Sequence, residues 1–381
     1  MSFRPSRSTL LAAGAVGAWL ALRARRERYD LRGRTVLVTG GSRGLGLALA
    51  RALVREGARV AICGRDTATL ERARIELERP DASVLAIPCD VTDPVQVEAM
   101  LQIVREWFGP LDVLVNDAGT IVVAPEQALT LADYDDAMRT NFFGVLHTTR
   151  AALPDLRRRP GSRIVNISSI GGVVGVPHLA PYVASKFAVT GYSLTLRAEL
   201  AAAGVVVTTI CPGLMRTGSP PNALFKGRHK AEYAWFSISD SLPGVTVSAE
   251  AAAERILRAC RRGEALVVFP WHMRAAQLLQ AVAPGVLTGL LGAANRVLPG
   301  YAGAPNRRMT GWQSRSVLSP SWLTTLGDRA TRRLNQSGDQ AALASAGPAA
   351  ASDASTEPSA FIAGVPSWRD NSTTLPASPT R

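Results

Sequence analysis

Between residues 34 and 270, short continuous apolar runs alternate with longer segments in which apolar residues recur every three or four positions. RTVLVTG (34–40) has the length and β-branched residues of a buried strand, whereas LALARALVREG (47–57) has the period of an amphipathic helix. Strands of this kind, alternating with helices, form parallel sheets covered by helices on both faces. The pattern predicts an α/β fold with a single doubly wound parallel sheet of about seven strands. The predicted strands are 34–40, 58–64, 83–90, 111–119, 162–169, 205–213 and 264–270, and the predicted helices are 47–57, 67–79, 94–109, 133–156, 185–204 and 249–263.

We assign this α/β domain to residues 31–272, and three further parts surround it. They are an apolar segment with basic flanks at 1–30, an apolar extension at 273–333, and a tail at 334–381 that is rich in Ala, Ser, Pro and Thr. The composition of the tail predicts disorder. Residues 274–300 carry only two charges, so they form either a core helix pair or a surface for membrane or dimer contact.

Residues 8–22 form an uncharged stretch between arginines. A spanning helix needs about 20 apolar residues, with about 17 as the lower bound, so the length is marginal. We interpret the stretch as a membrane anchor, with an interfacial helix and a secretory signal as alternatives. The cluster RARRER (23–28) stands where a signal peptide would have its cleavage site, and it favours a cytoplasmic location for the following domain. The expected protein is membrane-associated with a cytoplasmic catalytic domain, and otherwise cytoplasmic.

The composition limits the class of protein. With 381 residues, 47% apolar and 19% charged, the chain has material for a large core, which excludes global disorder and a small disulfide-stapled fold. Most of the net charge of +13 lies at the two ends, so no nucleic-acid partner is expected and basic ends near a membrane surface are favoured. The four cysteines and four histidines lack metal-site spacing, which predicts reduced thiols and no metal.

A glycine-rich turn, TGGSRGLG (39–46), joins the first predicted strand to the first predicted helix. Glycines let backbone N–H groups approach a pyrophosphate, and the helix that begins near Gly46 points the positive end of its dipole at the same anion. A glycine-rich loop alone is weak evidence. Its position between a strand and a helix of an alternating pattern predicts a nucleotide site.

The end of the second predicted strand indicates which nucleotide is bound. A site for NAD(H) usually has Asp or Glu there, to accept a hydrogen bond from the ribose 2′-hydroxyl. Here Gly64 supplies no carboxylate, while Arg65 and Arg43 supply two guanidinium groups that suit a 2′-phosphate. Asp66 comes one position late and is interpreted as the N-cap of the next helix. The sequence therefore favours NADP(H), with NAD(H) as the alternative.

Tyr182 and Lys186 stand four positions apart at the start of a predicted helix, so they share one helical face. An ammonium beside a phenol stabilises the phenolate and lowers the tyrosine pKa, which suits an acid–base role. Such a pair arises often by chance, but two polar residues accompany it. Ser169 ends the fifth predicted strand, with Ser168 as its alternative, and Asn141 lies within the long predicted helix, where an ordinary surface residue is the other reading.

Six motifs together resemble the short-chain dehydrogenase/reductase family in order and spacing: TGGSRGLG (39–46), NDAG (116–119), Asn141, NISS (166–169), YVASK (182–186) and PGLMRT (212–217). The resemblance covers about residues 33–270 and implies one Rossmann-type domain. It implies a catalytic tetrad: Tyr182 is the acid–base, Ser169 orients the carbonyl, Lys186 lowers the Tyr182 pKa and binds the nicotinamide ribose, and Asn141 holds a water. The cofactor-binding residues that it implies are Gly40, Ser42, Arg43, Gly44, Leu45, Gly46, Arg65, Asp90, Val91, Asn116, Ala118, Gly119, Tyr182, Lys186, Pro212, Gly213 and Thr217.

Asp117 departs from the family pattern, which usually has a second Asn at this position. Because that Asn commonly supports the turn between strands, the departure puts the local support in doubt but not the chemistry.

The segment between Thr217 and Ser248 is expected to cover a lipophilic ketone, alcohol or aldehyde, or else to pack only on its own domain. With the two apolar segments, it resembles the membrane-bound steroid and retinoid branch of the family. The alternatives are a reductase of another substrate class, such as a 3-oxoacyl thioester or sugar ketone, and a non-catalytic NADP(H)-binding protein. The resemblance also implies a homo-oligomer paired through the helices at 133–156 and 185–204. His178 is expected to be a surface-loop residue.

Overall fold

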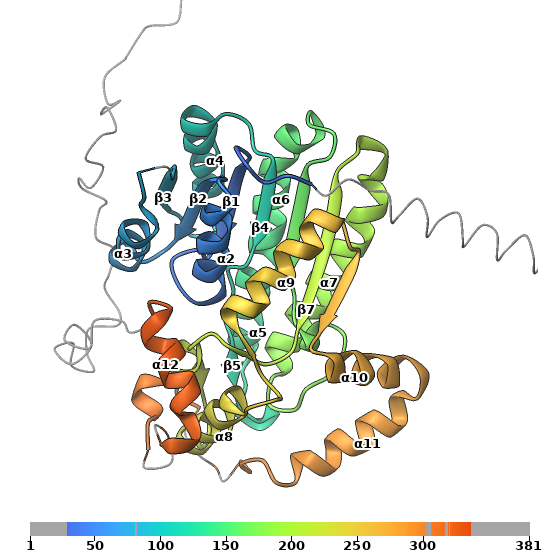
Figure 1. Cartoon of the computed structure of the whole chain (residues 1–381). Coiled ribbons are helices and arrows are strands. Elements are labelled where there is room, and N and C mark those ends of the chain that lie inside the picture. Colours follow the sequence, from blue (N-terminus) through green and yellow to red (C-terminus); the bar gives the residue numbers. More distant parts are fainter. Residues whose placement is uncertain are drawn as a thin grey trace, which may run out of the picture. The chain divides into compact units, whose positions relative to one another are not determined.

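The computed structural model describes residues 29–336 except 81, 302, 304, 305, 317, 318 and 320. The described residues belong to one compact unit (Figure 1). The apolar stretch at 8–22 and the tail beyond residue 336 lie outside the described residues, so the membrane anchor and the disordered tail stay predictions.

A seven-stranded parallel sheet forms the centre of the unit, with the strand order β11-β7-β6-β4-β1-β2-β3 (Figure 1). The predicted doubly wound parallel sheet is thereby confirmed. The chain runs outward from β1 to β3 and then returns to β4 on the other side of β1, so the carboxyl ends of β1 and β4 are where a ligand cleft is expected. The seven strands are β1 (Thr35–Thr39), β2 (Arg59–Gly64), β3 (Val84–Pro88), β4 (Val113–Asn116), β6 (Arg163–Ile167), β7 (Val206–Pro212) and β11 (Leu266–Phe269).

Two hydrophobic layers cover the two faces of the sheet. Because side chains alternate along a strand, Val36 and Val38 of β1 enter one layer and Leu37 enters the other. Helices complete both layers, as the continuous apolar strands require. The first layer includes α2 (Gly44–Arg55), α3 (Thr67–Leu77) and α9 (Ala249–Arg262), and the second includes α4 (Pro94–Phe108), α6 (Gly144–Arg157) and α7 (Ala180–Glu199).

The long helix predicted at 133–156 is interrupted. The structure has α5 (Leu131–Ala137), then a π-helical turn at Met138–Phe143, and then α6. Such turns occur frequently at functional sites. This one carries Asn141, whose side chain is buried, so the surface reading of Asn141 does not hold.

Shorter elements complete the unit. The helix α8 (His229–Ser241) lies in the segment that was expected to cover the substrate, and it contacts the small sheet β12-β9-β5 at β9. The short strands are β5 (Val122–Val123), β8 (Met215–Arg216), β9 (Leu224–Phe225), β10 (Val247–Ser248) and β12 (Met309–Thr310), and the 3-10 helices are Glu126–Ala128, Ile170–Gly172, Ala201–Ala203, Pro220–Asn222, Trp312–Ser314 and Trp322–Thr324.

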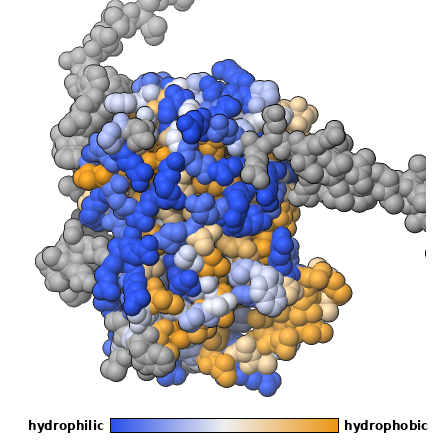
Figure 2. All heavy atoms as spheres, in the orientation of Figure 1, coloured by the Kyte–Doolittle hydropathy of each residue, from blue (hydrophilic) through white to orange (hydrophobic). Residues whose placement is uncertain are grey.

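Two apolar helices, α10 (Trp271–Val282) and α11 (Pro284–Asn295), project from the body of the unit (Figure 1). α10 has no buried side chain and α11 has only Leu287, so the core-pair alternative is wrong and a contact surface remains. Figure 2 shows apolar residues gathered over these helices. Within the described ranges, no helix has the length and apolarity to cross a membrane.

The helix α12 (Thr325–Arg333) brings the chain back to the first hydrophobic layer. Leu334 follows it and is only 1% exposed. Residues 334–336, which were predicted to belong to the tail, therefore pack with the α/β domain.

Candidate active site

The glycine-rich turn lies where β1 ends, beside the end of β4. Thr39 Oγ1 accepts hydrogen bonds from the N–H groups of Asp117 (3.0 Å) and Ala118 (3.1 Å), which hold the two strand ends together. Gly40 has a φ of +69°, and a Cβ there would lie 2.9 Å from Ala118 Cα. A Cβ on Gly46 would lie 2.3 Å from the Gly40 carbonyl oxygen. The close approach of these segments therefore requires glycine at both positions.

The first N–H groups of α2 differ in their partners. Gly44 donates to the Leu334 carbonyl oxygen (2.9 Å), and Gly46 donates to the Asp117 carboxylate. No described residue accepts from the Leu45 N–H. This donor stands at the positive end of a helix dipole, where a phosphate oxygen binds well. The turn therefore fits the pyrophosphate of a dinucleotide.

Arg43 and Arg65 lie next to the turn with exposed side chains. Desolvation and, next, the positive charge of Arg65 lower the pKa of the Arg43 guanidinium, so the two cations lie close enough to repel each other. A phosphate between them would relieve this repulsion. Asp66 caps α3 by accepting from the Thr69 N–H (2.6 Å), which confirms its interpretation as an N-cap.

The remaining cofactor candidates occupy three strand ends. Asp90 and Val91 follow β3, where Val91 is buried against Gly144. Beyond β7, Thr217 is 7% exposed, and a Cβ on Gly213 would lie 2.6 Å from Met273 Cγ. Gly213 thus packs tightly against α10. The candidates at these ends are Asp90, Val91, Asn116, Ala118, Gly119, Pro212, Gly213 and Thr217.

The side chain of Asn116 points into the protein. Its Nδ2 donates to Asn166 Oδ1 (2.8 Å), and its Oδ1 accepts from the Thr148 hydroxyl (2.7 Å). The amide is 1% exposed and ties β4 to β6 and α6. The side chain of Asn116 therefore holds strands and a helix together beneath the strand ends. Gly119, three residues later, is exposed.

Ser169, Tyr182 and Lys186 meet beyond the ends of β6 and β4. Lys186 Nζ donates to the Ile167 carbonyl oxygen (2.8 Å) and lies 5.7 Å from the centroid of the Tyr182 ring. Ser169 Oγ accepts from the Gly171 N–H (3.1 Å). A Cβ on Gly171 would lie 3.6 Å from that oxygen and 3.5 Å from Tyr182 Cε1, so the Ser169 hydroxyl and the Tyr182 ring lie on either side of Gly171 at ordinary contact distances.

Ser168 and Ser169 have different surroundings. Ser168 Oγ donates to the Lys186 carbonyl oxygen (3.0 Å) and lies 2.8 Å from Thr190 Oγ1, both inside the protein. Ser168 is therefore a packing residue, and Ser169 is the hydroxyl beside Tyr182.

Asn141 anchors the segment after β4 to α7. Its Oδ1 accepts from the Thr120 N–H (2.8 Å), and its Nδ2 donates to the Thr120 carbonyl oxygen (3.0 Å) and to Ser185 Oγ (2.9 Å). A Cβ on Gly119 would lie 3.0 Å from Asn141 Oδ1 and 3.8 Å from Lys186 Nζ. The π-helical turn thus places Asn141 within the same group as the other three tetrad residues.

Burial controls the ionisation of this group. It raises the pKa of Tyr182 to about 12, against the lowering effect of a hydrogen bond with Ser169, and the Asp117 charge raises it further. Burial lowers the pKa of Lys186 to about 8. The groups that shift the Tyr182 pKa in the structure do not include Lys186, whose ammonium donates to the Ile167 carbonyl oxygen, so the lowering of the Tyr182 pKa by Lys186 stays a prediction.

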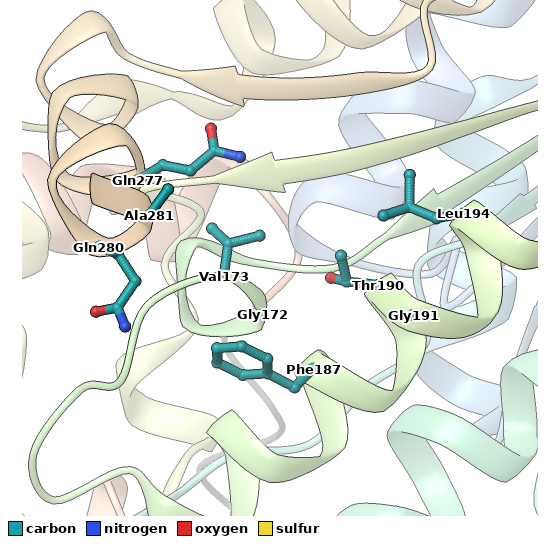
Figure 3. A pocket seen from close by; sticks show the side chains of 9 residues that line it. All are labelled: Gly172, Val173, Phe187, Thr190, Gly191, Leu194, Gln277, Gln280 and Ala281. Atoms are coloured by element: carbon teal, nitrogen blue, oxygen red, sulfur yellow. The ribbon is translucent and has the colours of Figure 1, made fainter. Parts of the chain in front are cut away.

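A hollow of about 390 Å³ lies between α7 and α10 (Figure 3). Phe187 and Leu194 line it from α7, and Gln277 lines it from α10. No tetrad residue borders it, so it belongs to the apolar surface near α10 and not to the reaction site.

His178 is not the surface residue that the sequence analysis expected. Its side chain is 6% exposed, and its Nδ1 lies 3.0 Å from both carboxylate oxygens of Glu232 on α8. Trp235 Nε1 donates to Glu232 Oε2 (2.7 Å). The pair ties α8 to the loop that precedes Tyr182. The sequence offered one indication of this buried partner for His178, because Glu232 is the one acidic residue between positions 224 and 238.

Asp117 generates a prediction about stability and pH. Burial raises its pKa to about 7, although Lys186 and the Gly46 N–H both lower it. The folded state then keeps a proton that the unfolded chain releases, so stability falls as pH rises from about 4 to about 7. Asp117→Asn should remove this loss and raise the free energy of unfolding at pH 8 by on the order of 2 kcal/mol, because Lys186 titrates with it and reduces the full effect.

Urea unfolding of both proteins at pH 4.5 and pH 8 measures the difference. Asp135→Asn, at an exposed position of α5, is the matched control. An equal effect of Asp117→Asn at both pH values would contradict the assignment.

Comparisons with known proteins agree with this geometry. Residues 34–223 match the family model described as short chain dehydrogenase. The chain is 35% identical to "Dehydrogenase/reductase SDR family protein 7-like" of Anopheles gambiae, over 70% of this chain and 84% of that protein. It is 33% identical to "Dehydrogenase/reductase SDR family member 7B" of Bos taurus (73% and 85%) and 40% identical to a "Putative ketoacyl reductase" of Streptomyces coelicolor (48% and 70%). The chain therefore belongs to the short-chain dehydrogenase/reductase family of nicotinamide-dependent oxidoreductases.

Proposed function

We propose that the protein is an NADP(H)-dependent oxidoreductase that interconverts a carbonyl and an alcohol on a lipophilic substrate, with Tyr182 as the acid–base. The observation that carries this proposal is the meeting of Ser169, Tyr182 and Lys186 next to the anion-binding turn, at the point where the sheet changes its direction of winding. A protein that only bound the nucleotide would have no use for this group.

The nicotinamide cofactor, when bound, supplies or accepts the hydride. In reduction, Tyr182 gives its phenolic proton to the carbonyl oxygen, and in oxidation it takes the hydroxyl proton of the alcohol. Ser169 Oγ donates a hydrogen bond to the same oxygen. Because burial raises the Tyr182 pKa to about 12, the phenol holds its proton at neutral pH, the form that donates in the reduction step. Lys186 Nζ lies 5.7 Å from the centroid of the Tyr182 ring, where its charge can act on the phenol while the ammonium donates to the Ile167 carbonyl oxygen.

Tyr182→Phe tests the chemical assignment. The variant keeps the ring and loses the proton donor, so the rate of NADPH oxidation with a panel of ketones should fall by at least about 10²-fold, the lower end of what acid–base groups contribute. Cofactor binding, followed by the fluorescence of bound NADPH, should stay within about twofold. A variant that keeps most of its rate would show that another group transfers the proton.

The preference for NADP(H) rests on Arg43 and Arg65. Both are exposed beside the anion-binding turn, and Asp66 is engaged as the N-cap of α3 and not turned toward the ribose. Arg65→Asp should reverse the preference, because a carboxylate repels a 2′-phosphate and accepts from a 2′-hydroxyl. Dissociation constants for NADPH and NADH, measured on both proteins, check this. Unchanged NADPH affinity in the variant would refute the two-arginine clamp.

A lipophilic substrate is supported by the side chains next to Tyr182. Tyr182 and Trp235 pack on a buried apolar cluster formed by α8, the small sheet and the loop before α7. Such surroundings exclude water and suit an apolar chain or ring. The cluster consists of Val123, Leu179, Ala223, Phe225, Tyr233 and Phe236. A 3-oxoacyl thioester is the second candidate, because several relatives, including that of Streptomyces coelicolor, are named ketoacyl reductases.

We also propose that α10 and α11 rest on a membrane surface. Leu278, Val286 and Leu290 are 65%, 57% and 58% exposed, and the two helices carry few charges.

We further propose that the protein forms a homo-oligomer through α7, where the side chains of Phe187 and Leu194 are more than 40% exposed. A monomeric mass in analytical sedimentation would contradict this proposal.

Detergent dependence of solubility tests the membrane proposal. Removing residues 1–28 should lower the detergent requirement in part. Adding Leu278→Asp with Leu290→Asp should lower it further, because charges on an apolar face prevent insertion. Leu131→Asp changes a residue that is 83% exposed on another face and should have no effect. An unchanged requirement in every variant would contradict the proposal.

A further inference from the structure

Three residues after α12 lie across the two loops that are proposed to hold the cofactor. We call Leu334, Asn335 and Gln336 the C-terminal strap. Leu334 is 1% exposed in the first hydrophobic layer, and its carbonyl oxygen accepts from the Gly44 N–H (2.9 Å). The strap is therefore anchored in the core and joined directly to the anion-binding turn.

Asn335 joins the glycine-rich turn to α3. Its Nδ2 donates to the carbonyl oxygens of Ser42 (2.9 Å) and Thr69 (2.8 Å), and its Oδ1 accepts from Arg72 Nε (3.1 Å). Ser42 directly precedes Arg43, and α3 begins two residues after Arg65. One side-chain amide thus connects the two backbone segments that carry the proposed arginine clamp.

The backbone conformation of Asn335 allows its side-chain amide to be removed without disturbing the main chain. Its φ is +54°, in the left-handed region that most residues avoid and that Asn tolerates. Glycine adopts the same conformation without strain. Asn335→Gly therefore removes the amide and leaves the backbone able to keep its course.

Gln336 joins the same turn to the loop after β7. Its Nε2 donates to the Thr217 carbonyl oxygen (3.2 Å), and its Oε1 accepts from Asn222 Nδ2 (2.7 Å). A Cβ on Gly44 would lie 2.7 Å from Gln336 Nε2, so the amide fills the space next to Gly44. The side chain is 4% exposed and sets the separation between Gly44 and Thr217.

We propose that the C-terminal strap is a wall of the cofactor site, in which Asn335 positions the arginine clamp for the 2′-phosphate and Gln336 positions the loop of Thr217 against the anion-binding turn. This inference rests on the proposed NADP(H) function. Both are positioning residues, since they act through the backbone of Ser42, Thr69 and Thr217.

Two features favour a wall over a plug that must leave before the nucleotide enters. The strap uses the Gly44 N–H and leaves the Leu45 N–H without a described acceptor, so the phosphate donor is not occupied. The strap is also held firmly. Thr331 packs so closely on Gly218 that a Cβ on Gly218 would lie 2.4 Å from the Thr331 backbone. If the strap left the site, the buried side chain of Leu334 would become exposed to solvent.

Equilibrium binding of NADPH and NADH to the full-length protein, without substrate, tests the proposal through the fluorescence of the bound nucleotide. Asn335→Gly should weaken NADPH binding by about tenfold and NADH binding by less than about threefold, because two hydrogen bonds that place the clamp are lost and the 2′-phosphate alone depends on it. Gln336→Ala should weaken both nucleotides by the same factor, about five- to tenfold. Arg332→Ala, at an exposed position of α12, should change neither.

A second pair of variants protects the test against misfolding. Asn335→Asp and Gln336→Glu keep the size of each side chain and remove the N–H donor, and they should reproduce the two binding patterns. Thermal unfolding of every variant accompanies the measurement. Unchanged affinities in folded variants would overturn the proposal, and so would tighter binding, which would identify the strap as a plug. If the wild type binds neither nucleotide, the proposed function itself is wrong.

Discussion

The buried ammonium of Lys186 is the constraint on which the rest of the site depends. A cation that is 5% exposed is costly unless it has hydrogen bonds and a nearby opposite charge. The ammonium donates to the Ile167 carbonyl oxygen at the end of β6, and the Asp117 carboxylate after β4 raises its pKa against the effect of burial. The ends of two strands and the start of α7 must therefore stay together. The placement of Tyr182 over this cation follows from the same requirement, since both lie on one face of α7.

Much of the fold was predictable because it depends on local patterns. The continuous apolar runs correspond to all seven strands, since a strand that is buried on both faces consists almost entirely of apolar residues. The glycine-rich turn was predictable because only glycine permits the approach of Gly46 to Gly40. The π-helical turn around Asn141 was not, because one irregular turn leaves the apolar spacing on both sides intact. Neither was the contact between Asn335 and Ser42, which are 293 positions apart and belong to no periodic pattern.

The two proposed sides of the cleft are held together in different ways. On the proposed cofactor side, the amides of Asn335 and Gln336 bind backbone carbonyl groups of the surrounding loops, at Ser42 and Thr217. On the proposed substrate side, side chains bind one another, above all the pair of His178 and Glu232 with Trp235. Differences in substrate among related proteins are therefore expected to arise in α8 and the loop before α7, where a single replacement changes the shape of the site.

The hydrogen bond from Gly44 to Leu334 has a consequence for the newly made chain. Synthesis proceeds at about 5–20 residues per second, so roughly 15–60 s separate the appearance of the turn from that of its partner. By the end of that interval every strand of the central sheet has been synthesised, since β11 ends at Phe269. The last part of the described chain to be made is therefore the segment that joins the glycine-rich turn to α12, after all seven strands are present. A premature stop codon shortly before Leu334 would leave a chain that lacks this segment as the permanent product.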